Sequence, residues 1–149
     1  MQSSIKSYVP INTDKEDIWK TLGIPSRGPV LHLAIHDGFP YAIFEQIASL
    51  LKLEKKKLGI HANIASATLT RRAKAGRFTP EESDRLYSFV QVLNSAINLF
   101  EGDLEAARQW MVKPVHGLGN RPPITMLATR VETEDVLSVI GRLEHGVLV

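Results

Sequence analysis

The sequence contains no cysteine and no long apolar run. Without cysteine the chain cannot form disulfides, thiolate zinc sites or a thiol nucleophile, which fits a reducing compartment. No stretch reaches the roughly 18 consecutive apolar residues of a membrane-spanning helix. The N-terminus MQSSIKSYVP has neither the charged nor the apolar region of a secretory signal. We therefore expect a cytoplasmic protein with no membrane partner.

Recognisable catalytic and metal-binding patterns are also lacking. His32 and His36 are spaced like metal ligands on a helix, but no acid lies between them to supply the carboxylate of a zinc hydrolase. The other histidines are separated in sequence and have no nucleophile beside them. The segment GLGNRPP has glycines near a helix start, yet it lacks the full phosphate-loop pattern. We therefore expect no enzyme, no metal and no cofactor.

Charge is divided unevenly along the 149 residues, of which 44% are hydrophobic. Residues 1–79 hold twelve Lys and Arg against six Asp and Glu, whereas residues 80–149 hold six against ten. Eight of the cations lie between Lys52 and Arg77, where Glu54 is the single acid. A basic half joined to an acidic half indicates two tasks, of which the basic one could involve a polyanion.

Helical periodicity dominates the chain, and we predict an all-α fold. Residues 1–28 are predicted to be a polar arm with at most one short helix, around residues 14–22. Residues 29–79 are predicted to be a helix-turn-helix region, and residues 80–149 a helical domain. The segment Val30–Gly38 could be a strand by its alternation, but Pro29 and Gly38 favour a short helix. The later predicted helices cover about residues 41–51, two short segments around residue 63, 81–100, 104–112 and 123–130, and a last helix ending at Gly146.

Three helix starts can be predicted from capping residues. Asp103 is predicted to cap the helix over residues 104–112. Thr79, Pro80 and Glu82 have the spacing of a capping box with proline at the first helical position. Thr133 is predicted to cap the last helix.

The basic segment between Lys52 and Arg77 contains the spacing of a helix-turn-helix motif. Gly59 supplies the very small residue where the second helix crosses the first, and Asn63, four residues later, tolerates the positive φ of the turn. Both helices would be anchored to the core by Leu58, Ala62, Ile64 and Leu69.

The second helix of this motif would begin near Ser66 and face DNA. The predicted DNA-binding residues are Ser66, Ala67, Thr68, Thr70, Arg71, Lys74 and Arg77. Arg72 fits poorly, because such motifs usually bury an aliphatic side chain there; it either snorkels or the helix packs differently. The alternative is that the basic cluster is only a solvated helix face.

Three stretches together resemble the Xre/MbcA/ParS antitoxins, the partners of RES-domain toxins: LTRRAKAGRFTPEESDRL, LFEGDLEAARQWMVKPVHGLGNRPPITML and VLSVIGRLEHGVLV. The resemblance implies a Cro-like helix-turn-helix region followed by a small helical toxin-binding domain. In this family the C-terminal part covers the active-site entrance of a toxin that degrades NAD+, so the antitoxin would act by steric occlusion. The resemblance also implies a homodimer or a larger toxin–antitoxin oligomer, and repression of its own operon through operator DNA.

Carried onto this chain, the resemblance assigns toxin binding to one loop and to the C-terminus. The residues concerned are His116, Gly117, Gly119, Asn120, Arg121, Pro122, Arg142, Glu144, His145, Gly146, Val147, Leu148 and Val149. On the residues alone, GVLV is an apolar tail after a helix-ending glycine, and it could either anchor in a partner or simply fray. Glu144 and the terminal carboxylate could meet cations in a pocket shaped for a dinucleotide diphosphate.

Two other functions stay open on the residues. A stand-alone helix-turn-helix transcriptional regulator would use its C-terminal half for dimerisation or ligand sensing. A small enzyme has little support, because no nucleophile, metal set or acid–base pair is recognisable.

Overall fold

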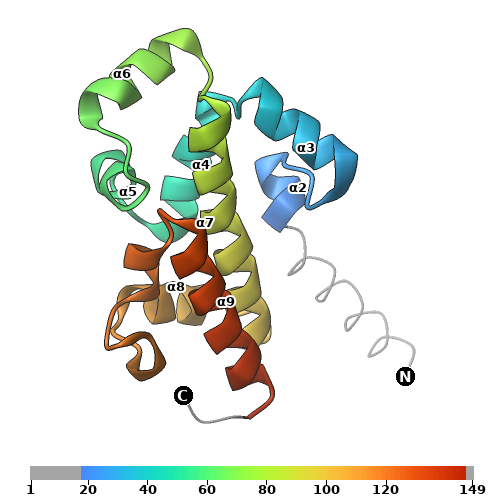
Figure 1. Cartoon of the computed structure of the whole chain (residues 1–149), viewed down its shortest axis with the longest axis vertical. Coiled ribbons are helices and arrows are strands. Elements are labelled where there is room, and N and C mark those ends of the chain that lie inside the picture. The colour runs from blue at the N-terminus through green and yellow to red at the C-terminus, as the bar shows by residue number, and fades with distance from the viewer. Residues whose placement is uncertain (1–17, 147–149) are drawn as a thin grey trace, which may run out of the picture.

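The computed structural model describes residues 18–146, within which all regular secondary structure is helical (Figure 1). The all-α prediction is therefore confirmed, and the segment Val30–Gly38 lies mostly within a helix. The elements are α2 (Ile18–Leu22), α3 (Gly28–Asp37), α4 (Tyr41–Leu51), α5 (Lys55–His61), α6 (Ser66–Ala75), α7 (Pro80–Leu99), α8 (Leu104–Val112), the 3-10 turns η1 (His116–Leu118) and η2 (Pro123–Met126), and α9 (Arg130–Glu144).

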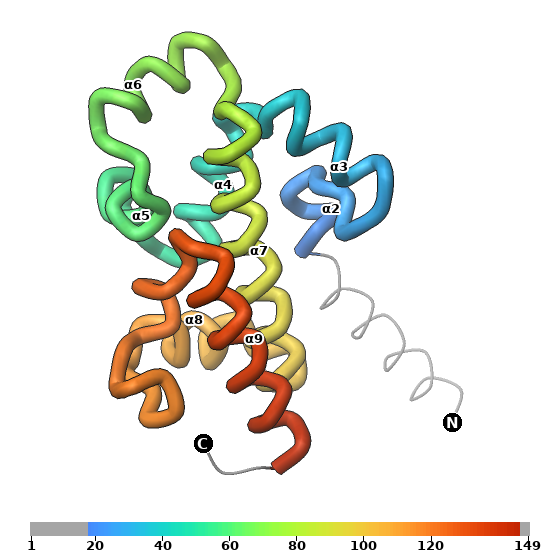
Figure 2. Tube along the Cα trace, in the orientation of Figure 1, coloured from blue at the N-terminus to red at the C-terminus, as the bar shows by residue number. Residues whose placement is uncertain are grey.

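The long helix α7 is the central element of the fold. Its start is the predicted capping box: the Thr79 hydroxyl accepts from the Glu82 amide, and the Glu82 carboxylate accepts from the Thr79 amide. Its 20 residues span about 30 Å. Figures 1 and 2 show α3 to α6 toward one end of the molecule and α8 and α9 toward the other, with α7 running between them. Its apolar side chains, including Leu86, Phe89 and Leu93, belong to the core that both ends share.

The described part of the predicted polar arm is packed against the core, so the arm prediction is wrong for residues 18–24. Ile18, Leu22 and Ile24 are buried. The ring centroids of Trp19 and of Tyr87 on α7 are 5.5 Å apart, and the Tyr87 hydroxyl donates to the Ser26 carbonyl at 3.0 Å. The amphipathic spacing of the three aliphatic residues outweighs the polar composition around them. Residues 1–17 of the arm lie outside the described residues.

The start of the last helix also differs from its prediction. Thr129, and not Thr133, caps α9, because the Thr129 hydroxyl accepts from the Glu132 amide at 3.3 Å. Thr133 is buried inside the first turn, where its hydroxyl donates to the Thr129 carbonyl at 2.8 Å. The helix predicted over residues 123–130 is reduced to the 3-10 turn η2, and the remaining residues form the cap of α9.

Candidate functional site

The turn between α5 and α6 has the geometry that the sequence predicts. A Cβ atom on Gly59 would lie 2.8 Å from Leu69 Cδ1 and 3.0 Å from the Ile64 carbonyl oxygen, which is too close for most side chains. Asn63 adopts a φ of 58°, in the left-handed region. The four predicted anchors, Leu58, Ala62, Ile64 and Leu69, are all buried. Residues 55–75 therefore form a complete helix-turn-helix unit.

The residues predicted to read DNA lie on the outer surface of α6 and just after it. Ser66, Ala67, Thr70, Arg71, Lys74 and Arg77 are exposed, and Thr68 is half-buried. Some of the side chains contact their own helix: Arg71 Nη2 lies 3.4 Å from Thr68 Oγ1, and the Thr70 hydroxyl donates to the Ser66 carbonyl at 3.2 Å. Figure 1 shows α6 at the end of the molecule farthest from the end of α9. The face is thus open to a large partner.

Arg77 also has a structural contact. Its Nη1 donates to the Gly38 carbonyl at 2.7 Å, and its backbone pairs with Pro40 in an isolated β-bridge. The neighbouring Phe78 amide donates to the Phe39 carbonyl at 3.0 Å. These contacts fix the chain after α6 to the turn between α3 and α4, which commits part of the Arg77 guanidinium.

The poor fit of Arg72 to the motif is explained by an ion pair with Glu82, a partner that the sequence pattern does not indicate. Arg72 Nε lies 2.7 Å from Glu82 Oε1, and Arg72 Nη2 lies 3.0 Å from Glu82 Oε2. Burial alone would raise the pKa of Glu82, but hydrogen bonds from Arg72 and Thr79 outweigh it and lower the pKa below its ordinary value. Glu82 therefore stays ionised beside Arg72 at neutral pH.

Further cations lie on α5, which precedes the turn. Lys56 and Lys57 are exposed, whereas Lys55 pairs with Glu45 at 2.7 Å. The hydrogen bond to Glu45 raises the pKa of Lys55. Lys56 and Lys57 are not among the residues that the sequence predicts to bind DNA, although the run of cations from Lys52 to Arg77 could have indicated them. They extend the positive charge of the helix-turn-helix unit.

The loop predicted to bind a toxin is a closed, hydrogen-bonded structure. The Val115 amide donates to the Arg121 carbonyl at 3.2 Å, and Gly119 and Asn120 have positive φ values of 69° and 62°. Leu118 is buried beneath the loop. Around it His116, Gly117, Gly119, Asn120 and Arg121 are exposed, and Pro122 is half-buried.

Arg121 ties this loop to α9. Its Nη2 lies 2.6 Å from Glu132 Oε2, while the Thr129 hydroxyl donates to the other carboxylate oxygen at 2.9 Å. The hydrogen bond from Arg121 is the main cause of the lowered pKa of Glu132. One edge of the Arg121 guanidinium is therefore committed within the chain.

The second predicted segment lies at the end of α9. Arg142, Glu144, His145 and Gly146 are exposed, and His145 Nδ1 lies 2.7 Å from the Gly141 carbonyl oxygen. Val147, Leu148 and Val149 lie outside the described residues. The turn η1 packs against α9, and Figure 2 shows this loop and the end of α9 at the same end of the molecule.

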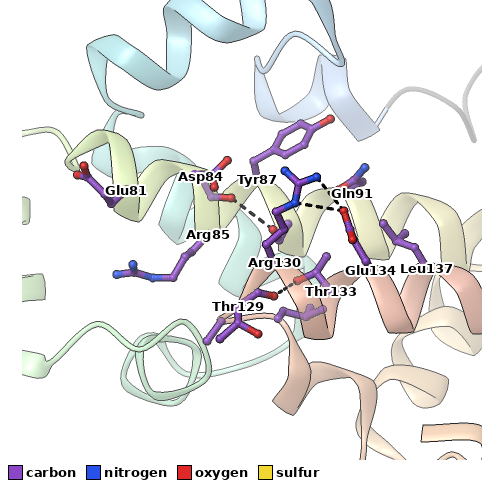
Figure 3. Close-up of a pocket in the computed structure, with 13 residues that line it drawn as sticks. Glu81, Asp84, Arg85, Tyr87, Gln91, Thr129, Arg130, Thr133, Glu134 and Leu137 are labelled. Atoms are coloured by element: carbon purple, nitrogen blue, oxygen red, sulfur yellow. Dashed lines mark hydrogen bonds and ion pairs between the residues drawn. The ribbon is translucent and has the colours of Figure 1, made fainter.

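A groove of about 510 Å³ lies between α7 and the start of α9 (Figure 3). Several charged groups around it are already paired: Arg130 Nη2 lies 3.0 Å from Glu134 Oε2, and Arg85 Nε donates to the Ala62 carbonyl at 2.8 Å. Within residues 18–146 no group of three His, Asp or Glu side chains is placed to hold a metal ion. Nor does that part of the chain contain a helix with the length and hydropathy needed to span a bilayer.

Comparison with known proteins covers both halves of the chain. Residues 30–91 match the family described as the antitoxin Xre-like helix-turn-helix domain, and residues 95–146 match the antitoxin Xre/MbcA/ParS C-terminal toxin-binding domain. A Yersinia enterocolitica protein named Antitoxin Xre is 40% identical over 146 residues, covering 96% of this chain and 99% of the relative. A Photorhabdus laumondii protein of the same name is 38% identical over 133 residues, covering 88% and 90%. The first family match ends and the second begins within α7.

Proposed function

Because this chain belongs to the Xre antitoxin family, we propose that it neutralises a RES-domain toxin that degrades NAD+, by covering the entrance to that toxin's active site. The observation that carries the proposal is the position of the loop around His116–Pro122 beside α9, within the part that matches a toxin-binding domain. Blocking an entrance needs shape and contact area but no chemistry, so the antitoxin itself performs no reaction.

We propose further that the protein represses its own operon through the helix-turn-helix unit. The support is the exposed face of α6 and its distance from the C-terminal segments, because a bound toxin would then leave α6 open (Figure 1). Helix-turn-helix proteins commonly read two half-sites as a two-fold dimer, so a homodimer or a larger complex with toxin is the expected form on the operator.

The toxin-binding proposal is tested by deleting residues 142–149. The shortened chain should lose protection of NAD+ against the co-purified toxin, because the end of α9 and the tail would no longer reach the entrance. A cooperative unfolding transition and unchanged operator binding serve as controls for folding. Full protection by the shortened chain would contradict occlusion by this segment. If the neighbouring gene product neither co-purifies with the full chain nor degrades NAD+, the alternative of a stand-alone transcriptional regulator gains support.

The DNA-binding proposal is tested by replacing Arg71 and Lys74 with Gln. Each lost phosphate contact should reduce the slope of log affinity against log salt by about 1, because fewer counterions are released. The matched control is Lys113→Gln, which removes a cation after α8, away from α6. Operator affinity and salt slope that do not change in the double variant would mean that the α6 cations are only solvated.

A further inference from the structure

Arg72 differs from its basic neighbours in α6 because its side chain points into the protein. Only 22% of the side chain is exposed, and that of Glu82 is 9% exposed. Two guanidinium nitrogens meet two carboxylate oxygens, at 2.7 Å and 3.0 Å. This two-bond geometry fixes direction as well as distance, which a lysine or a single hydrogen bond would not do.

Glu82 is itself held firmly at the start of α7. Its Oε1 accepts from the Thr79 amide at 2.9 Å, in addition to Arg72 Nε. Its own amide donates to the Thr79 hydroxyl at 3.1 Å. The carboxylate therefore cannot shift without undoing the cap of α7, and α7 carries much of the core.

The helix α6 has few other attachments. Among its ten residues, all of them described, only Leu69 is buried, and the helix packs chiefly on α5. The contacts of Arg77 and Phe78 hold the chain after α6, but within the helix Leu69 is the one buried anchor. Arg72 lies three positions after Leu69 and so on the same face of the helix, where the ion pair supplies a second fixed point.

We propose that Arg72 and Glu82 are positioning residues for DNA recognition, and that Arg72 is not a phosphate contact. The pair sets the angle at which α6 leaves the body of the protein, and with it the direction of the Arg71 and Lys74 side chains. This proposal rests on the proposed DNA binding, but its structural part concerns α6 without DNA.

The substitution Glu82→Gln distinguishes a positioning role of Arg72 from a phosphate contact, because the two roles predict opposite changes in operator affinity. Gln can still serve the capping box, but its amide nitrogen cannot accept the second Arg72 bond. If Arg72 positions α6, operator affinity should fall, on the order of tenfold. If Arg72 binds phosphate, the same substitution frees its guanidinium and removes a nearby negative charge, so affinity should rise. A rise would overturn the proposal.

The matched control is Glu81→Gln, which removes the same charge from the neighbouring, exposed position of α7. It should leave operator affinity unchanged or slightly higher. If Glu81→Gln and Glu82→Gln weaken binding equally, the effect comes from general charge and the proposal fails.

A second variant, Arg72→Met, keeps an unbranched apolar stem but lacks the guanidinium that bridges to Glu82. We expect the double variant Arg72→Met, Glu82→Gln to bind no more weakly than either single variant, because the two residues act as one unit. Additive losses would contradict the pair as the cause.

Amide hydrogen exchange without DNA completes the test. In the Glu82→Gln and Arg72→Met variants, the amide hydrogens of α6 should exchange faster than in the wild type, while those of α8 and α9 keep wild-type protection. Unchanged exchange in α6 would overturn the positioning role, whatever the DNA result. If the wild-type chain shows no salt-dependent DNA binding, the DNA proposal fails separately, and the exchange result still decides whether the pair holds α6.

Discussion

At the scale of single residues, the turn between α5 and α6 depends on the missing side chain of Gly59. Leu69 Cδ1 and the Ile64 carbonyl oxygen occupy the space that a Cβ atom would need. Gly141 in α9 offers a contrast, because a Cβ atom there would meet no atom within 4 Å. Substitution at Gly141 therefore tests helix propensity alone, whereas substitution at Gly59 tests helix propensity together with close packing.

We predict opposite effects for alanine at these two positions. Gly141→Ala should raise the free energy of unfolding by up to about 1 kcal/mol, through helix propensity alone. At Gly59 the same gain is opposed by overpacking that costs roughly 1–3 kcal/mol, so Gly59→Ala should lower the free energy of unfolding. Urea denaturation of both variants measures the difference. Equal stabilisation by both substitutions would show that the helix crossing has room for a methyl group.

His61, the last residue of α5, should make the stability of the protein sensitive to acid. Burial lowers its pKa below the ordinary 6.5, and the charge of Lys57 lowers it further. A folded-state pKa below the unfolded one gives stability that is fully present above pH 6.5 and is lost as pH falls through the folded pKa. His61→Gln should therefore flatten the decline of the urea midpoint below this pH. The control His32→Gln, at an exposed position, should decline as the wild type does.

Residues that act locally could be predicted from the sequence, and residues with distant partners could not. Gly59 and Asn63 satisfy a spacing rule within one turn, so the pattern sufficed. Arg72 could be recognised as a misfit, but its partner Glu82 is ten positions away on another helix. The acceptor of Arg77 lies 39 positions earlier, at Gly38. Such pairs depend on how helices pack, which composition and periodicity do not specify.

At the scale of elements, helix starts were predicted well where one residue could cap and less well where two could. The capping box at Thr79 has no competitor nearby. Around the start of α9, Thr129 and Thr133 are each followed within three residues by an acidic residue, and Thr129 is the cap in the structure. Thr133 is buried in the first turn instead. Packing of that turn, which the sequence pattern does not contain, decides between the two caps.

We predict that Thr129→Ala costs about 1 kcal/mol of stability, as the loss of a helix cap usually does. The hydroxyl of Thr129 accepts from the Glu132 amide and donates to the Glu132 carboxylate, so its loss also weakens the support of Arg121. Thr129→Ser keeps the hydroxyl and should remain near the wild type. Chemical denaturation followed by circular dichroism measures both. A loss of the same size in the serine variant would point to packing of the methyl group in place of the cap.

At the scale of the whole molecule, the two functional halves share their core. The predicted boundary at residue 79 falls at the cap of α7, whereas the helix-turn-helix family match continues to residue 91. Bonds also cross between the halves: Arg85 on α7 donates to the Ala62 carbonyl after α5, and Arg108 on α8 donates to the Leu50 carbonyl in α4 at 2.9 Å. The two family matches follow the order that the sequence predicts, a helix-turn-helix domain and then a toxin-binding domain. The sequence does not predict that the two domains share a core and are joined by these hydrogen bonds.

Because the two halves share one core, we predict a single cooperative unfolding transition, which the fluorescence of the two tryptophans can test. Trp19 lies on α2 against Tyr87, and Trp110 lies on α8 at the edge of the core of the other half. In Trp110→Phe and Trp19→Phe variants, the remaining tryptophan reports one half alone. Within each variant, the fluorescence and circular dichroism midpoints should coincide, because neither half can lose α7 without exposing the core of the other. If Trp19 fluorescence changes at a lower denaturant concentration than the helicity does, α2 detaches first. If the two tryptophans report different midpoints, the two halves unfold independently.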